Sequence, residues 1–271
     1  MKDLFSLKDK IAVITGGLGQ LGQQFSVTLV DYGAKVAVID LSEAVKPRLS
    51  QFSRYQRDAK IICYPGDITN RESLTAILTE ILKTWGDPHI LINNAAIDSP
   101  PDAPISENGP FETYPESSLE RIMDVNLKGT FIACQVFGEC MAKNRRGSII
   151  NVGSIYGLVS PNQEIYEYKR TKNEQFFKPA PYSLTKSGIY NFTRYLATYW
   201  AQKGVRVNTI TPGGIFNNQP NAFLAEYCRR VPMGRMANPD EMNGAIVFLA
   251  SDASSYMTGS NLIVDGGWTA W

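Results

Sequence analysis

Short apolar runs rich in β-branched residues recur along the chain, and longer mixed stretches separate them. The runs are continuously apolar rather than alternating, which is typical of strands covered on both faces. The stretches between them are long enough for crossover helices, which connect parallel strands in a right-handed sense. The pattern predicts an α/β fold with a doubly wound, seven-stranded parallel sheet and helices on both faces. The predicted strands are residues 11–14, 36–39, 60–63, 90–92, 148–152, 205–208 and 262–264.

We expect a single domain over residues 1–271, because no repeat, low-complexity tract or linker divides the chain. Two segments depart from the regular alternation of strands and helices. Residues 98–116 are rich in proline and polar side chains, and residues 160–181 are rich in aromatic and charged ones. Long loops in compact domains are often functional, so we expect 160–181 to be a substrate-side insertion. Variable surface decoration is the alternative, since loops tolerate insertions.

Composition excludes several classes of partner. The 27 lysines and arginines balance 26 aspartates and glutamates, so no global charge favours nucleic acid or a membrane surface. The sequence shows neither a signal peptide nor an apolar run long enough to span a membrane, which predicts a cytoplasmic protein. The four cysteines lack paired short spacing and are expected to be reduced. His89 is the only histidine and precedes an apolar run, so we expect a role at strand entry and no metal site.

Glycines and polar residues directly follow the predicted strands. The carboxyl ends of parallel strands meet at one edge of a sheet, and ligands bind beyond that edge. A binding edge is therefore predicted from these strand-end residues. They are Thr15-Gly16-Gly17, Asp40, Asp67, Asn93-Asn94-Ala95, Gly153-Ser154 and Thr211-Pro212-Gly213.

The turn after the first strand reads Thr-Gly-Gly-Leu-Gly-Gln-Leu-Gly over residues 15–22 and opens a helix. Glycines let the backbone approach a pyrophosphate, whose charge a helix N-terminus favours. Asp40 ends the second strand at about the ~20-residue distance expected of a Rossmann-type dinucleotide site. A carboxylate there accepts hydrogen bonds from ribose hydroxyls and repels a 2′-phosphate, which predicts NAD as the cofactor. The alternative is that Asp40 is a solvated loop carboxylate.

Tyr182 and Lys186 are four residues apart in a predicted helix, which places them on one face. A phenol has a pKa near ~10, and a neighbouring ammonium is expected to lower it. Tyr182 is then suited to exchange a proton with an alcohol while a hydride passes to or from a nicotinamide. Tyr168 and Lys172 have the same spacing, but the prolines that follow them argue against a rigid helix there.

From about residue 10 to residue 267 the chain resembles the short-chain dehydrogenase/reductase family. Thr15, Gly16 and Gly22 match the family's Thr-Gly-x-x-x-Gly-x-Gly motif, whereas Gln20 occupies its middle glycine position. The ending Asp-Gly-Gly-Trp over residues 265–268 is similar to family members associated with bacterial surface-sugar biosynthesis.

The resemblance implies four catalytic residues. It makes Tyr182 the proton-transfer residue and Ser154 the hydrogen-bond partner of the reacting oxygen. It implies that Lys186 also grips the nicotinamide ribose and that Asn126 positions a water in a proton relay. The strand-end Ser154 and the four-residue spacing from Tyr182 to Lys186 are both in place.

Cofactor contacts follow from the turn and the resemblance together. The resemblance assigns 67–68 to the adenine, 93–96 to a strand-end motif, and Pro212, Gly213 and Ile215 to the nicotinamide side. It also implies a mobile flap at 216–235 and a homotetramer or homodimer. The predicted contacts are Gly16, Gly19, Gln20, Leu21, Asp40, Asp67, Ile68, Asn94, Ala95, Tyr182, Lys186, Pro212, Gly213 and Ile215.

The predicted function is hydride transfer between NAD(H) and a secondary alcohol or ketone of a small sugar or sugar-phosphate-like substrate. Four basic residues and nearby aromatic ones predict that the insertion binds a polar or anionic substrate, such as a sugar phosphate or a nucleotide-linked sugar. The basic residues are Lys169, Arg170, Lys172 and Lys178. One alternative is reduction of a 3-ketoacyl group on acyl carrier protein, against which Asp40 argues. Another is a non-catalytic NAD sensor, which would be expected to lose the tyrosine, lysine or serine.

Overall fold

The computed structural model describes residues 3–41, 44, 52–57, 60–99, 105–170 and 175–271, and its seven parallel strands form one sheet. The sheet order is β3-β2-β1-β4-β5-β6-β7. The chain reverses its winding between β1 and β4, where Thr15 lies opposite Asn93. The predicted doubly wound fold is confirmed, and this switch point is where such sheets bind ligands. The strands are β1 (Ile11–Thr15), β2 (Lys35–Asp40), β3 (Ile61–Pro65), β4 (Ile90–Asn93), β5 (Gly147–Val152), β6 (Val205–Pro212) and β7 (Asn261–Val264).

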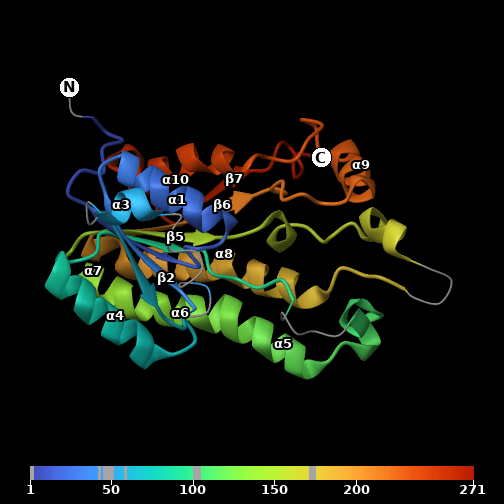
Figure 1. Ribbon diagram of the computed structural model, residues 1–271, viewed down its shortest axis with the longest axis horizontal. Coiled ribbons are helices and arrows are strands. Elements are labelled where there is room, and N and C mark those ends of the chain that lie inside the picture. The colour runs from blue at the N-terminus through green and yellow to red at the C-terminus, as the bar shows by residue number, and fades with distance from the viewer. Residues whose placement is uncertain (1–2, 42–43, 45–51, 58–59, 100–104, 171–174) are drawn as a thin grey trace.

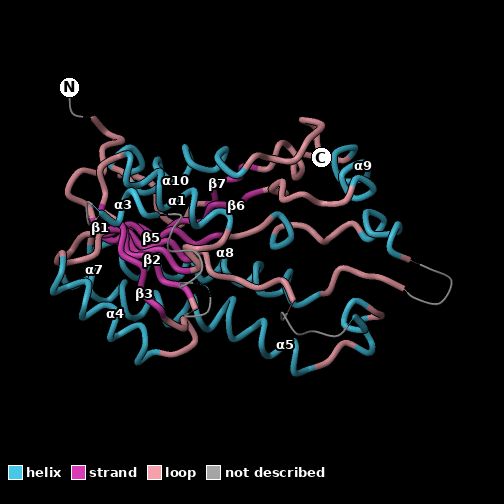
Figure 2. The backbone as a smooth tube through the Cα atoms, in the orientation of Figure 1, coloured by secondary structure: helices cyan, strands magenta, loops and turns pink. Residues whose placement is uncertain are grey.

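Helices cover both faces of the sheet (Figures 1 and 2). On one face, α1 and α10 pack on the sheet. On the other, α4, α8 and the segment from α5 to α7 do so. None of the described helices is both long enough and apolar enough to cross a membrane. The helices are α1 (Gln20–Asp31), α3 (Ser53–Arg57), α4 (Arg71–Thr84), α5 (Glu116–Met123), α6 (Thr130–Ala133), α7 (Glu139–Lys143), α8 (Ala180–Trp200), α9 (Asn221–Arg229) and α10 (Asn243–Ala250).

Two apolar clusters divide the core between the faces. In β1, Ala12 and Ile14 contact the α1 side, whereas Ile11 and Val13 contact the opposite side. Both sets are buried, which explains the continuous apolarity of the strands. Each isoleucine or valine side chain among them contributes about 1.5–3 kcal/mol when fully buried.

A third apolar cluster lies beyond the carboxyl ends of the strands. It joins the insertion, through the short helix η7 (Gln163–Lys169), to α9 in the flap. Tyr166 contacts the ring of Phe223, and Tyr227 stacks on Trp268 at 4.5 Å between centroids. Figure 1 shows η7 in yellow beside the orange α9. The insertion and the flap therefore form one wall next to the binding edge.

His89 lies at the opposite, amino-terminal edge of the sheet. Its Nδ1 accepts a hydrogen bond from the Ile11 N–H at 3.2 Å. Burial and the nearby charges of Arg146 and Lys10 lower the pKa of His89 to about 4, so the ring is neutral. The predicted strand-entry role is confirmed. All four cysteines are free, and burial raises the pKa of Cys134 to about 12.

Candidate active site

Steric crowding fixes the glycine turn. Gly16 has φ +61°, and a Cβ there would lie 2.7 Å from the Cα of Ala95. A Cβ at Gly22 would lie 2.3 Å from the backbone oxygen of Gly16. Gly19 caps α1 without any side-chain hydrogen bond, which leaves N–H groups of the first turn free of a capping side chain. Such a terminus favours an anion like a pyrophosphate.

Asp40 connects β2 to this turn. One carboxylate oxygen accepts the Leu18 N–H at 2.9 Å, and the other accepts the Leu41 N–H at 2.9 Å. Each oxygen of a carboxylate has a further acceptor position. Asp40 can therefore hold the turn and still accept hydrogen bonds from a ligand's hydroxyl groups.

A cavity of about 390 Å³ lies between the turn, Asp40 and the end of β4. Its place at the glycine turn and the acidic residues Asp40 and Asp67 in its lining suit the adenosine and pyrophosphate part of a dinucleotide. Nine of the predicted cofactor contacts line it: Gly16, Gly19, Gln20, Leu21, Asp40, Asp67, Ile68, Asn94 and Ala95.

The remaining predicted cofactor contacts lie on other elements. Pro212 ends β6, and the Gly213 N–H donates to the Val264 oxygen at 2.9 Å. Ile215 forms a parallel bridge with Ala237. Tyr182 and Lys186 lie near the start of α8. These residues extend the site past the carboxyl end of β6, away from the adenosine cavity.

Gln20, at the position where the family motif has glycine, is the first residue of α1. A helical backbone does not require glycine, so the substitution leaves the turn intact. The Gln20 side-chain amide donates to the backbone oxygen of Phe216 at 2.6 Å. The side chain therefore contacts the flap, residues 216–235. No pattern in the sequence predicted this contact.

Ser154 follows β5, and its side chain lies next to the Tyr182 phenol. Tyr190, which sequence reasoning missed, fixes the Ser154 backbone: its hydroxyl accepts the Ser154 N–H at 3.2 Å and donates to the Ser154 oxygen at 2.7 Å. Tyr190 lies two helical turns beyond Tyr182, a spacing that puts both on one helix face. That spacing was the available signal.

Lys186 is buried beside this pair, and its Nζ donates to the Val152 carbonyl at 2.7 Å. The ammonium lies 5.7 Å from the Tyr182 ring centroid. Burial lowers the pKa of Lys186 to about 8, and the charge of Asp98 opposes that change. The predicted Ser154, Tyr182 and Lys186 cluster is therefore assembled at the end of β5.

The expectation that Lys186 makes Tyr182 acidic is wrong for the protein without ligand. Burial raises the pKa of Tyr182 well above its ordinary value, and Asp98 adds to that shift. The hydrogen bond from Ser154 lowers the pKa but does not offset burial. The phenol is protonated at neutral pH until a further positive charge enters the site.

Asn126 lies in a π-helical turn, Asp124–Gly129, between α5 and α6. Its side-chain oxygen accepts the Ile97 N–H at 2.8 Å, and its amide donates to the Ile97 oxygen at 2.8 Å and to the Thr185 hydroxyl at 3.0 Å. The side chain therefore joins the loop after β4 to α8. Such π-turns are frequent at functional sites.

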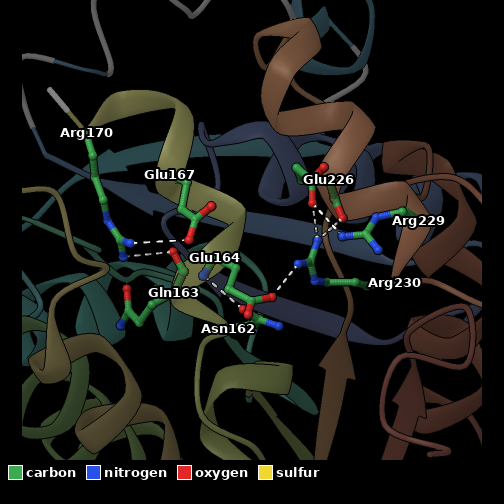
Figure 3. Close-up of polar contacts among 8 residues, drawn as sticks. All are labelled: Asn162, Gln163, Glu164, Glu167, Arg170, Glu226, Arg229 and Arg230. Carbon is green, nitrogen blue, oxygen red and sulfur yellow. Dashed lines mark hydrogen bonds and ion pairs between the residues drawn. The ribbon is translucent and has the colours of Figure 1, made fainter.

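The basic surface expected of the insertion is largely engaged within the protein. Arg170 donates to the backbone oxygens of Phe176 and Gln163 and pairs with Glu167, as Figure 3 shows in part. Lys178 pairs with Asp98. An open binding site for a phosphate is therefore not formed by these two cations. Their main-chain partners could not be read from the sequence.

Tyr182 is preferred over Tyr168 by structure as well as by sequence. Tyr182 lies in the first turn of α8, which begins at Ala180 with Pro181 at its start. Tyr168 lies in the last turn of η7 and is exposed. Lys172 lies outside the described residues. Tyr182 alone of the two is placed against Ser154.

A cavity behind a glycine turn at the switch point of a doubly wound sheet, together with a buried serine and lysine beside a tyrosine, is typical of an oxidoreductase that uses a nicotinamide cofactor. A sequence model of the family described as enoyl-(acyl carrier protein) reductase matches residues 19–269. Galactitol 2-dehydrogenase of Rhizobium johnstonii is 33% identical over 279 aligned residues, which cover 98% of each protein.

Solved structures agree with this assignment. A short-chain dehydrogenase from Leptospira borgpetersenii with bound NAD⁺ is 35% identical, with a TM-score of 0.84 over 99% of this chain and 96% of that one. A gluconate 5-dehydrogenase from Burkholderia cenocepacia, with NADP and tartrate, is 27% identical, with a TM-score of 0.85 over 99% and 98%. The chain belongs to the short-chain dehydrogenase/reductase family and is an oxidoreductase acting on CH–OH groups.

Proposed function

We propose that this enzyme interconverts a secondary alcohol and a ketone in a neutral polyol or sugar, with NAD as its cofactor. The observation that carries the proposal is that the Ser154 side chain lies next to the Tyr182 phenol, beside the buried Lys186. A cluster of this kind has no packing purpose, because burying a lysine and two hydroxyl groups costs free energy. Because the cluster lies at the binding edge, we assign it a role in catalysis.

Two hydroxyl groups meet where the substrate oxygen would bind. Ser154 donates a hydrogen bond to that oxygen, and Tyr182 takes the alcohol proton during oxidation or returns it during reduction. A nicotinamide bound beside these residues would supply the hydride acceptor or donor and, in its oxidised form, a positive charge. Lys186 is protonated below about pH 8 and favours the phenolate that proton transfer creates. Asn126 supports the catalytic residues by holding α8 in position through Thr185.

The preference for NAD rests on Asp40. Its carboxylate lines the adenosine cavity, where it accepts ribose hydroxyls and repels a 2′-phosphate. Asp40→Asn retains the acceptor for Leu18 and removes the charge. We expect kcat/KM with NADP to rise about 10–100-fold relative to NAD, since like charges in contact cost several kcal/mol. An unchanged ratio contradicts this role.

A neutral polyol is the substrate class that best fits the insertion and the relatives. The galactitol dehydrogenase is named for a polyol, and Arg170 and Lys178 already have internal partners. The Ser154, Tyr182 and Lys186 cluster argues against a non-catalytic NAD sensor, and Asp40 argues against an NADP-dependent acyl-carrier-protein reductase.

We also infer a homotetramer or homodimer formed through α6 and α8. Phe131, Tyr195 and Tyr199 are exposed on this face, and the last two rings stack at 5.9 Å. An exposed aromatic group of this kind is typical of a protein interface. Light scattering of Tyr195→Glu beside the wild type tests this oligomeric state, and a wild-type monomer contradicts it.

The four free thiols fit a cytoplasmic location.

The decisive experiment combines a substrate panel with Tyr182→Phe. Galactitol, other alditols and their ketoses are assayed with NAD and NADP. We expect NAD-dependent turnover of at least one alditol, and a loss of about 10²–10⁴-fold in kcat for the variant. Near-unchanged thermal unfolding shows that the variant folds. Turnover that survives the substitution refutes Tyr182 as the proton-transfer residue.

A further inference from the structure

An ion pair between Lys178 and Asp98 lies beside Tyr182. The Lys178 ammonium is 5.5 Å from the centroid of the Tyr182 ring, close to the 5.7 Å of the Lys186 ammonium. Two cations from different segments therefore lie near one phenol. Only Lys178 is paired with a carboxylate. The Lys178 side chain is 14% exposed and that of Asp98 is 48% exposed, so the open side of the pair is its carboxylate.

Two hydrogen bonds made by the backbone of Lys178 fix its position. Its N–H donates to the side-chain oxygen of Gln163 at 2.7 Å, and its carbonyl accepts from the Gln163 amide at 3.1 Å. Arg170 donates to the backbone oxygens of Gln163 and Phe176 and holds the two sides of the insertion together. The insertion therefore presents Lys178 at a defined place, with little ordering left to occur when a ligand binds.

The position of Asp98 is fixed from the other side of the site. The residue before it, Ile97, has both its N–H and its carbonyl bonded to Asn126 at 2.8 Å. The Asp98 charge raises the pKa of both Tyr182 and Lys186, which places its carboxylate within electrostatic range of both. The pair thus joins the loop after β4 to the insertion, directly next to the reacting group.

We propose that the Asp98–Lys178 pair determines substrate specificity by binding a hydroxyl group next to the reacting carbon and by disfavouring anionic substrates. The inference rests on the proposed function and names the chemistry that recognises the substrate. A hydroxyl donates to a carboxylate and accepts from an ammonium, so neighbouring hydroxyls are complementary to the pair. A carboxylate or phosphate on the substrate meets the negative charge of Asp98 and a Lys178 that is already paired.

Two substitutions separate the two halves of this role. Asp98→Asn is expected to lower kcat/KM for galactitol about 10–100-fold, mainly through KM, because a hydrogen bond to a charged group is lost. The same variant leaves Lys178 unpaired and should raise kcat/KM for gluconate. Lys178→Met should also lose galactitol activity but gain nothing on gluconate. Cyclohexanol, which lacks a second hydroxyl, should change by less than about threefold in either variant.

The insertion offers a matched control. Lys169 lies over the Phe176 ring at 4.3 Å and is exposed, whereas Asp98 pairs with Lys178. Lys169→Met should leave the galactitol to cyclohexanol ratio as in the wild type. Lys178→Arg keeps the charge and should retain more galactitol activity than Lys178→Met. Thermal unfolding of each variant identifies any general loss of folding.

The outcomes are distinct. Equal losses on galactitol and cyclohexanol, with no gain on gluconate, overturn the specificity role and leave a purely structural or electrostatic one. If a substitution shifts the pH profile of kcat/KM equally for galactitol and cyclohexanol, the pair acts electrostatically on the catalytic residues. That result also overturns the specificity role. A wild-type enzyme that oxidises none of these alcohols refutes the proposed function and this inference together. A wild type that oxidises galactitol but is insensitive to both substitutions refutes the inference alone.

Discussion

Gln20 and Phe216 connect the glycine turn to the flap through one hydrogen bond of 2.6 Å. The donor is the side chain that replaces a glycine of the family motif, and the acceptor is the first residue of the flap. The cofactor cavity and the substrate wall are therefore linked at their common border. A ligand bound in the cofactor cavity can therefore affect the substrate wall through this hydrogen bond, and a bound substrate can affect the cavity in the same way.

Removing this link should weaken substrate binding. Gln20→Ala loses a hydrogen bond of about 0.5–1.5 kcal/mol, so we expect kcat/KM to fall about 2–10-fold. Gln24, one turn further along α1, makes no hydrogen bond to the flap within the part of the chain that the structure describes. Gln24→Ala is the control and should stay near the wild type. Equal kinetics of Gln20→Ala and Gln24→Ala contradict the prediction.

Arg230 and Arg229 are neighbours in the flap with different contacts (Figure 3). Arg230 is 16% exposed and bridges Glu226 to Glu164 of the insertion, whereas Arg229 is 66% exposed and pairs only with Glu226. Arg230→Met should lower the unfolding free energy by about 1–2 kcal/mol and raise the substrate KM. Arg229→Met should cost less than about 0.5 kcal/mol. Urea unfolding measures the stability of each variant, and initial rates measure its KM. Similar losses in the two variants would exclude a stabilising ion pair between the flap and the insertion.

Gly22 and Gly244 form a second matched pair. A Cβ at Gly22 meets the backbone of Gly16 and Gly17, but one at Gly244, in α10, meets nothing within 4 Å. Gly22→Ala should destabilise the protein by about 2–3 kcal/mol and weaken NAD binding. Gly244→Ala should stabilise it by about 0.5–1 kcal/mol, because alanine favours a helix. Calorimetry with and without NAD tests both signs, and a harmless Gly22→Ala would show that the turn can move.

His89 should make stability depend on pH. Its pKa in the folded protein is about 4, below the ordinary 6.5. Between these values the unfolded chain binds a proton that the folded protein does not, so stability falls as the pH drops through that window. His89→Asn keeps an acceptor for Ile11 and should reduce the loss between pH 7 and pH 5 by about 1 kcal/mol, after allowance for solvent screening. Urea unfolding at both pH values measures it; an identical loss in the variant contradicts the assignment.

The sequence predicted the elements whose signal is local. Continuous apolar runs located all seven strands, and the glycine turn with Asp40 located the cofactor cavity. Ser154, Tyr182 and Lys186 follow from spacing and from their place after a strand. A strand or a helical spacing depends on neighbouring residues only, so one sequence suffices.

Contacts between distant segments were not predictable in the same way. Tyr190 fixes Ser154 through its hydroxyl, and Lys178 contacts Asp98 across the site. The charge of Lys178 indicated a ligand, but the fold had already supplied its partner. The pKa of Tyr182 was misjudged for a related reason: burial, which a sequence does not display, outweighs the nearby cation.

The two hydrogen bonds of Asp40 carry a consequence for redesign. The carboxylate that we propose to discriminate between NAD and NADP also accepts the Leu18 N–H, so under this proposal cofactor choice and the integrity of the loop depend on one side chain. An engineer who replaces it with alanine to accept a phosphorylated ribose would also remove both backbone hydrogen bonds, whereas asparagine removes the charge and keeps one acceptor, for the N–H of either Leu18 or Leu41.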